Sequence, residues 1–144
     1  MRMDRMTSRL QAALSDAQSL AVGKDHNYVQ PVHLLRVLFD DKSSGVRQLL
    51  VQAGGRVDEL DKSLSAEVDR LPTITQPTGE VGIGPELAKL LNLADRHAQK
   101  RGDKFISSEL VLLAASEDSG ALGRLFRDAS IKREALEKAI ANVR

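Results

Sequence analysis

The chain has 144 residues, a length typical of one folding unit, and its 21 lysines and arginines nearly balance its 20 aspartates and glutamates. The resulting formal charge of +1 gives no overall field that would attract nucleic acid or an anionic membrane, so we expect neither as a partner. No cysteine is present, which excludes disulfides, thiolate metal sites and cysteine nucleophiles and is typical of a reducing cytoplasm.

Only 3% of the residues are aromatic, and strand-like alternation of apolar and polar residues is hard to find, which predicts an all-α fold. The N-terminal residues 1–6 lack the apolar core of a signal peptide. The longest apolar run, Leu110 to Ala115, is far shorter than the roughly 20 residues of a membrane span. We therefore expect a cytoplasmic domain without a membrane segment.

The first two helices are marked by apolar residues at helical spacing and by their end signals. Gly23 is placed to end the first helix, and Pro31 occupies a favoured first-turn position of the second. The apolar stripe of the first helix consists of Leu10, Ala13, Leu14, Ala17 and Ala21. The stripe of the second consists of Leu34, Leu35 and Leu38.

The third and fourth helices are predicted between Ser43 and Pro72. Ser43 and Ser44 offer N-caps for a third helix that Gly54 and Gly55 end. A fourth helix ends before Pro72, and its stripe consists of Leu60, Leu64, Val68 and Leu71.

Residues 72–84 are rich in threonine, proline and glycine without apolar periodicity, which indicates a linker. Pro85 then opens a fifth helix that Gly102 ends, and Ser107 or Ser108 caps a sixth. Two further helices carry the apolar residues Leu122, Leu125 and Phe126, and Leu136, Ile140 and Val143.

The second half of the chain repeats the first. Ala17 matches Ala94 at an offset of 77 residues, and Leu60 matches Leu136 at an offset of 76. Further matches are Leu10 with Leu87, Leu34 with Leu110, Leu49 with Leu125, and Ala53 with Ala129. The sequence thus predicts one domain over residues 1–144, built from a first repeat (1–71), a linker (72–84) and a second repeat (85–144), as two pseudo-symmetric four-helix units with a groove where they meet.

Four segments carry a resemblance to a known family. They are residues 1–7, residues 16–21, the helix start at 31–35, and above all the ten consecutive residues from Arg101 to Leu110. Together they resemble the double Clp N-terminal repeat of the bacterial ClpB disaggregase family, and the resemblance covers the whole chain.

The resemblance implies a part of a homohexameric AAA+ ATPase that extracts polypeptides from aggregates with the DnaK chaperone system. The ATPase modules, with their ATP and Mg²⁺, would lie outside this sequence, so no cofactor is expected here. The implied task is to bind unfolded or aggregated protein, and the isolated domain is expected to be monomeric. The alternative within the family is an adaptor-binding domain of a protease-coupled Clp unfoldase; a small helical enzyme or nucleic-acid binder is the alternative from another class.

The resemblance implies five substrate-engaging residues, of which Leu91 and Leu110 would form an apolar lining. Thr7 can donate and accept hydrogen bonds, while Asp103 and Glu109 can accept from a peptide backbone or attract basic residues. Each also has an ordinary structural explanation. The leucines lie in core-type stripes, Asp103 can shape a turn, Glu109 can stabilise a helix N-terminus, and Thr7 can bond its own backbone.

Catalytic and metal-binding patterns are not expected. The glycine spacing of residues 79–84 superficially matches a P-loop, but Pro85 and Glu86 follow where lysine and a hydroxyl residue are required. His26, His33 and His97 have no metal-ligand spacing, and the carboxylates are dispersed over amphipathic helices. His33 aligns with Glu109 in the repeat.

Overall fold

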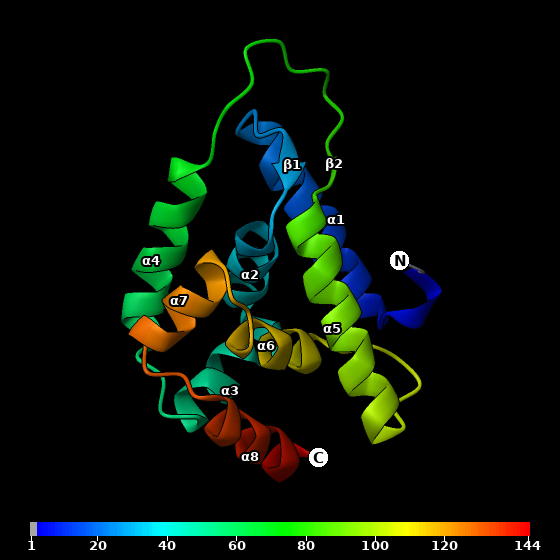
Figure 1. Ribbon diagram of the computed structural model, residues 1–144, viewed down its shortest axis with the longest axis vertical. Helices are drawn as coiled ribbons and strands as arrows, with labels where there is room; N and C mark the ends of the chain where they lie inside the picture. The colour runs from blue at the N-terminus through cyan, green and yellow to red at the C-terminus, as the bar shows by residue number, and fades with distance from the viewer. Residues whose placement is uncertain (1–2) are drawn as a thin grey trace.

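The computed structural model describes residues 3–144, and within this range it has eight α-helices and a two-stranded sheet (Figure 1). Met1 and Arg2, which belong to the N-terminal segment of the family resemblance, lie outside the described residues. The helices are α1 (Ser8–Gly23), α2 (Pro31–Asp40), α3 (Val46–Gln52), α4 (Val57–Arg70), α5 (Pro85–Arg101), α6 (Ser108–Ser116), α7 (Ala121–Asp128) and α8 (Arg133–Val143). The strands are β1 (Tyr28–Val29) and β2 (Gly82–Ile83), and the two 3₁₀ helices are Met3–Arg5 and Lys42–Ser44. The all-α prediction is confirmed.

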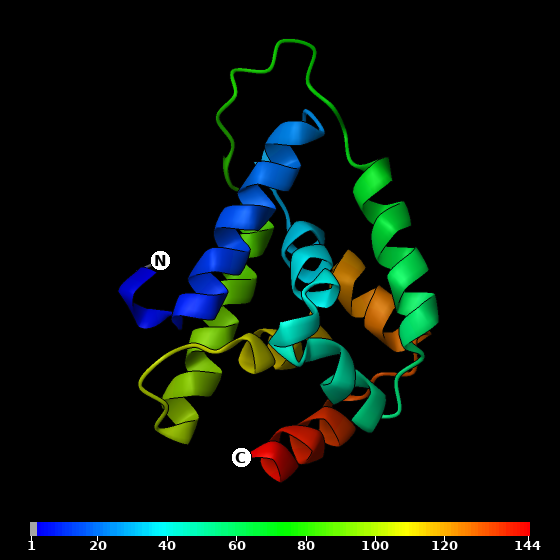
Figure 2. The same ribbon diagram turned by 180° about the vertical axis from the view of Figure 1, so that it is seen from behind.

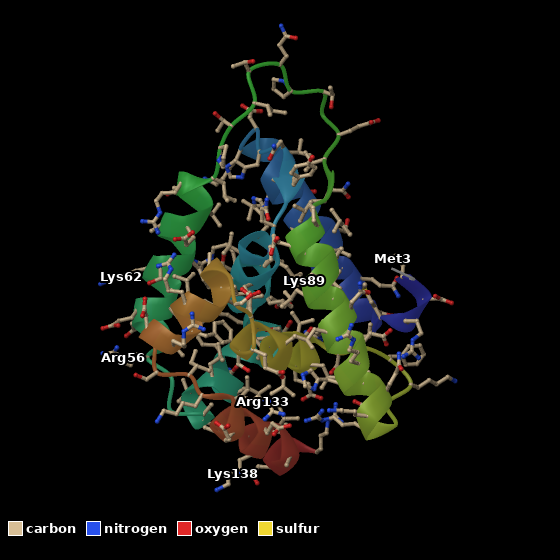
Figure 3. All side chains as sticks on the ribbon, viewed as in Figure 1. Met3, Arg56, Lys62, Lys89, Arg133 and Lys138 are labelled. Atoms are coloured by element: carbon tan, nitrogen blue, oxygen red, sulfur yellow. The ribbon has the colours of Figure 1, made fainter. Side chains whose placement is uncertain are left out.

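The helices enclose a single apolar core with α6 at its centre. All residues from Leu110 to Ala115 are completely buried, so α6 is apolar all round rather than amphipathic. It packs against α5, α7, α8 and α3, and it lies in the middle of the ribbon in both views (Figures 1 and 2). Charged side chains point outward at the periphery, as Lys62, Lys89 and Lys138 show (Figure 3).

Most helix ends follow the sequence signals. Pro31 and Pro85 occupy the first turns of α2 and α5, and Gly102 ends α5 with a positive φ of 71°. The N-cap position of α3 is Gly45, with a φ of 76°, and not Ser43 or Ser44, which belong to a 3₁₀ turn; the Ser44 hydroxyl nevertheless accepts a hydrogen bond from the Val46 N–H at 3.2 Å. Such a φ favours glycine, since it is costly for residues with a Cβ.

The linker is not wholly irregular. Its residues Gly82 and Ile83 form β2, which pairs in parallel with β1, and Gln18 of α1 donates a hydrogen bond to the carbonyl of Val81 at 2.7 Å. Thr73 also forms an isolated bridge with His26, and residues 75–80 arch away from the helices between α4 and α5 (Figure 1). The sequence did not indicate β2 because a two-residue strand has no measurable alternation.

The two halves exchange equivalent contacts. Ile83 pairs with Val29 in the sheet, and Met6 pairs with Ile106 in an isolated parallel bridge. The residues that follow repeat the relation: the Thr7 N–H donates to the Ile106 carbonyl at 3.0 Å, and the Gly84 N–H donates to the Val29 carbonyl at 3.1 Å. In each half, the segment before the first helix therefore pairs with the segment before the second helix of the other half. This exchange is expected for units related by an approximate two-fold axis.

The turns after α1 and α5 also match. Asp25 and Gly102 are 77 residues apart and both have a positive φ, of 58° and 71°. The following residues close the helices in the same way: the His26 N–H donates to Ala21 at 3.0 Å, and the Asp103 N–H donates to Ala98 at 2.9 Å. This equivalence places His26 and Asp103 at corresponding positions of the two halves.

Candidate functional site

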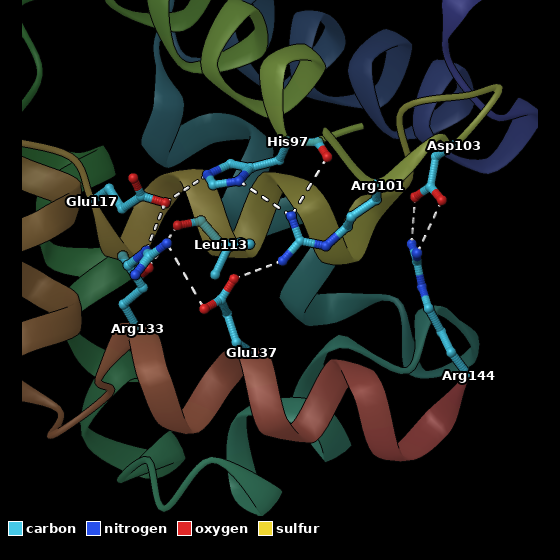
Figure 4. Close-up of polar contacts among 9 residues, drawn as sticks. His97, Arg101, Asp103, Leu113, Glu117, Arg133, Glu137 and Arg144 are labelled. Atoms are coloured by element: carbon cyan, nitrogen blue, oxygen red, sulfur yellow. Dashed lines mark hydrogen bonds and ion pairs between the residues drawn. The ribbon is translucent and has the colours of Figure 1, made fainter. Parts of the chain in front are cut away.

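Arg144 is held by two carboxylates of the predicted site, those of Asp103 and Glu109, and Figure 4 shows its contact with Asp103. Asp103 follows the turn that ends α5, Glu109 lies in the first turn of α6, and Arg144 follows the last residue of α8. The guanidinium of Arg144 donates from Nη1 and Nη2 to the two oxygens of Asp103, at 3.1 and 2.7 Å. It also donates from Nε and Nη2 to Oε1 of Glu109, at 2.9 and 2.7 Å. We call the two carboxylates, Asp103 and Glu109, the acidic clamp.

These bonds raise the pKa of the Arg144 guanidinium, chiefly through the side-chain hydrogen bond to Asp103, while partial burial opposes the shift. The cluster is not sealed from solvent, because the side chains of Arg144, Asp103 and Glu109 keep 35%, 22% and 20% of their surface exposed. Ion pairs of this exposure are worth little in net stability, since water competes for both charges. Another cation could therefore replace Arg144 at the two carboxylates at little cost in stability.

A small cavity adjoins the clamp at Glu109. It measures about 240 Å³ and lies where the start of α1, the start of α6 and α3 meet. Its lining residues come from these three elements and their preceding turns: Thr7, Arg9, Ser44, Val46, Leu49, Ser107, Ser108 and Glu109. We call it the α1–α3–α6 pocket. Val46 and Leu49 are its apolar lining residues, although both are largely buried, whereas Arg9 and Glu109 place opposite charges on its rim.

Thr7 is the N-cap of α1, and its Oγ accepts a hydrogen bond from the Leu10 N–H at 3.2 Å. The Thr7 N–H is used by the bridge to Ile106, so the residue is fixed at both backbone and side chain. On the other side of the pocket the Oγ of Ser108, in a residue only 8% exposed, has no hydrogen-bond partner among residues 3–144. The structure thus brings Thr7 and Glu109 to one pocket, with Asp103 beside it across Arg144.

Comparison with known proteins assigns the family. The model of the Clp repeat (R) N-terminal domain matches residues 5–129. The chain belongs to this family. A ClpB chaperone of Pseudomonas putida is 51% identical over 144 residues, which is 100% of this chain and 17% of that protein. This Clp N-terminal domain therefore spans about one sixth of the length of the curated relatives it matches, and its resemblance to ClpB is confirmed.

Solved structures of Clp N-domains have the same fold. The N-domain of ClpV from Vibrio cholerae superposes with a TM-score of 0.79 at 28% identity, covering 97% of this chain and 85% of that one. A complex of a ClpV N-domain with a VipB peptide gives a TM-score of 0.76 at 26% identity, covering 96% of this chain and 86% of that one. The latter shows that a Clp N-domain of this fold binds a peptide of another protein.

The predicted apolar lining of the Clp N-terminal domain has to be corrected. Leu91 and Leu110 are both completely buried, because α5 and α6 pack their apolar faces against each other in the core. A side chain without exposed surface cannot line an open groove, so their role in this conformation is in the core. The apolar residues in the lining beside Thr7 and Glu109 are instead Val46 and Leu49, which are 1% and 8% exposed, so the open apolar surface at the pocket is small. The sequence shows these two only as members of an apolar stripe in the third helix.

A second polar cluster in Figure 4 holds α8 against α5 and α6. His97 bonds to Glu117 at 2.5 Å, and Arg101 donates to Glu137 of α8 at 2.7 Å. Arg133 of α8 lies 3.3 Å from Glu117. These contacts join helices to one another, so we assign them to stability.

Two buried histidines occupy the position in the first half that the acidic clamp occupies in the second. His26 Nδ1 and His33 Nε2 lie 2.8 Å apart, and the two residues are 3% and 0% exposed. No group of three or more potential metal ligands occurs among residues 3–144, and the helices there include none long and apolar enough to cross a membrane.

Proposed function

We propose that this domain binds unfolded or aggregated polypeptides for a ClpB-type disaggregase and passes them to an ATPase ring in the rest of the protein. The observation that carries the proposal is the α1–α3–α6 pocket, which joins Thr7 and Glu109 over an apolar floor. The ClpB relatives support the chaperone context, and the ClpV N-domain with its VipB peptide supports binding of peptide segments by this fold.

The pocket matches what a receptor for many unrelated unfolded chains requires. Apolar surface binds any hydrophobic segment, and side-chain acceptors such as Glu109 can satisfy backbone N–H groups or attract flanking basic residues. A segment burying about 400 Å² of apolar area gains on the order of 10 kcal/mol, against roughly 4 to 15 kcal/mol for association and ordering. Weak binding of each segment follows, and several copies in a homohexamer would supply avidity on an aggregate.

The remaining parts of the proposal concern the whole protein. ATP and Mg²⁺ would bind in its ATPase modules, the DnaK system would deliver clients, and the protein would act in the cytoplasm. The domain itself would perform no catalysis, act as a monomeric module and bind neither nucleic acid nor membrane.

The test is client binding by matched carboxylate variants. Glu109 and Glu86 are both the second residue of a helix, α6 and α5, so Glu109→Gln and Glu86→Gln remove the same helix-dipole interaction. With a permanently unfolded casein derivative as the probe, we expect Glu109→Gln to weaken binding and Glu86→Gln to leave it unchanged. Equal binding by both variants would contradict the proposal.

Docking of one defined adaptor is the second candidate, because the ClpV N-domain complex contains a specific VipB peptide. The two candidates differ in selectivity. A disaggregase domain should bind several unrelated unfolded proteins with similar affinity. An adaptor-docking domain should bind none of them, and should bind one folded partner.

A further inference from the structure

The two halves of the domain use equivalent positions in opposite ways. His26 and Asp103 correspond at an offset of 77 residues, and His33 and Glu109 correspond at 76. In the first half the two side chains bond directly to each other, from His26 Nδ1 to His33 Nε2 at 2.8 Å. In the second half both side chains are acceptors when ionised, so they cannot bond each other and instead share the guanidinium of Arg144.

The second position therefore needs a cation. Two neighbouring carboxylates repel, and a positive group between them removes this repulsion while satisfying their lone pairs. The geometry favours a guanidinium over an ammonium, because Asp103 receives two parallel bonds from Nη1 and Nη2 while Glu109 receives bonds from Nε and Nη2. The single nitrogen of a lysine cannot reproduce this fork.

Arg144 can leave the clamp through a change of its own side-chain rotamer, because that side chain is 35% exposed. The clamp shares Glu109 with the α1–α3–α6 pocket, where the apolar residues Val46 and Leu49 lie. An incoming arginine could thus bind Asp103 and Glu109 while the apolar residues next to it in the client occupy the pocket.

We propose that Asp103 and Glu109 form a receptor for client arginine side chains and that Arg144 is its internal competitor. This inference rests on the proposed function, because it specifies which segments the same site prefers. The domain would select apolar segments flanked by arginine, and Arg144 would keep the clamp closed to weaker ligands and neutralise it when no client is bound.

The experiment compares three fluorescent peptides that carry the same apolar residues with a central arginine, lysine or citrulline. Citrulline keeps the shape of arginine and removes its charge. Binding is measured by fluorescence anisotropy with the unaltered domain, with Arg144→Gln, and with Lys138→Gln as control. Lys138 is an exposed cation on α8 (Figure 3), so this variant matches the charge change.

We expect Arg144→Gln to bind the arginine peptide about two- to fivefold more tightly, the range set by the small net value of partly exposed ion pairs. The gain should be smaller for lysine and absent for citrulline, and Lys138→Gln should show no gain. Adding Asp103→Asn to Arg144→Gln should abolish it. In the unaltered domain, the Nε–H resonance of Arg144 should move toward its solvent-exposed position as the arginine peptide is added.

Two results separate the failure of this inference from the failure of the proposed function. If the unaltered domain binds all three peptides equally and Arg144→Gln changes nothing, client binding stands and the arginine receptor is refuted. If no peptide and no unfolded protein binds to any variant, both are refuted. Thermal unfolding of each variant shows that the folded domain is being compared.

Discussion

Acidification between pH 7.5 and 5 should destabilise the domain through the buried pair His26 and His33. The Gln30 N–H donates to Nδ1 of His33 at 2.8 Å, so this nitrogen carries no proton. His33 Nε2 must then carry the proton and donate it to Nδ1 of His26 at 2.8 Å. Both rings are consequently neutral, and a second proton on His33 would face a backbone donor.

The magnitude follows from the pKa of His33, which burial first and the neighbouring His26 second lower from 6.5 to about 4. Burial also lowers the pKa of His26, helped by Lys24 and opposed by Asp25 and Asp69. Between pH 6.5 and about 4 the unfolded chain binds more protons at this residue than the folded chain does. The contribution of neutral His33 to the free energy of unfolding is therefore present above pH 6.5 and is lost as the pH falls toward 4. For His33 alone the loss is about 2 kcal/mol between pH 7.5 and 5, and approaches about 3 kcal/mol below pH 4.

The assay is urea unfolding followed by circular dichroism at pH 7.5, 6.5 and 5, a range in which most carboxylates stay ionised. His33→Gln is the matched variant, because its amide can still accept from Gln30 and donate to His26 without titrating. We expect the unaltered domain to lose about 2 kcal/mol more than His33→Gln over this range. Parallel stability curves for the two proteins would refute the assignment of neutral, coupled histidines.

Three further predictions concern stability and are checked by urea unfolding. Arg36 is 8% exposed and bonded to two carboxylates, so Arg36→Ala should cost about 2 kcal/mol, less than a fully buried pair because the carboxylates remain hydrated; an unchanged midpoint would contradict this. A Cβ at Gly123 would lie 1.8 Å from the carbonyl oxygen of Asp118, so Gly123→Ala should lower the free energy of unfolding by more than about 2 kcal/mol. The control is Gly23→Ala, which should be nearly neutral because a Cβ there meets open space. Asp25 has a φ of 58°, so Asp25→Gly should raise stability by about 0.5 to 1 kcal/mol, and a loss would show that its side chain matters more than its backbone.

The sequence predicted the helices well because their signals are local. Apolar spacing, Pro31, Pro85 and Gly102 each act within a turn or two, and their helices begin and end where expected. The third helix shows the limit of this reasoning. Its cap was assigned to Ser43 or Ser44 from residue type, but the chain there forms a 3₁₀ turn whose exit conformation requires Gly45.

The site was harder to predict because it depends on contacts between distant segments. The family resemblance indicated Thr7, Asp103 and Glu109, and the structure brings Thr7 and Glu109 to one pocket with Asp103 next to it. No sequence pattern shows that Arg144 lies between the two carboxylates, since the pairs are 41 and 35 residues apart. For the same reason the sequence could not distinguish leucines of the core, such as Leu110, from those beside the pocket, such as Leu49.

We propose that the α1–α3–α6 pocket and the acidic clamp together receive unfolded polypeptide. The most direct measurement is an NMR titration of the isotope-labelled domain with a permanently unfolded casein derivative. We predict shifts confined to the amides of Thr7, Leu49, Asp103, Ser107 and Glu109, and their loss in Glu109→Gln but not in Glu86→Gln. Shifts elsewhere, or none at saturating client, would contradict the account.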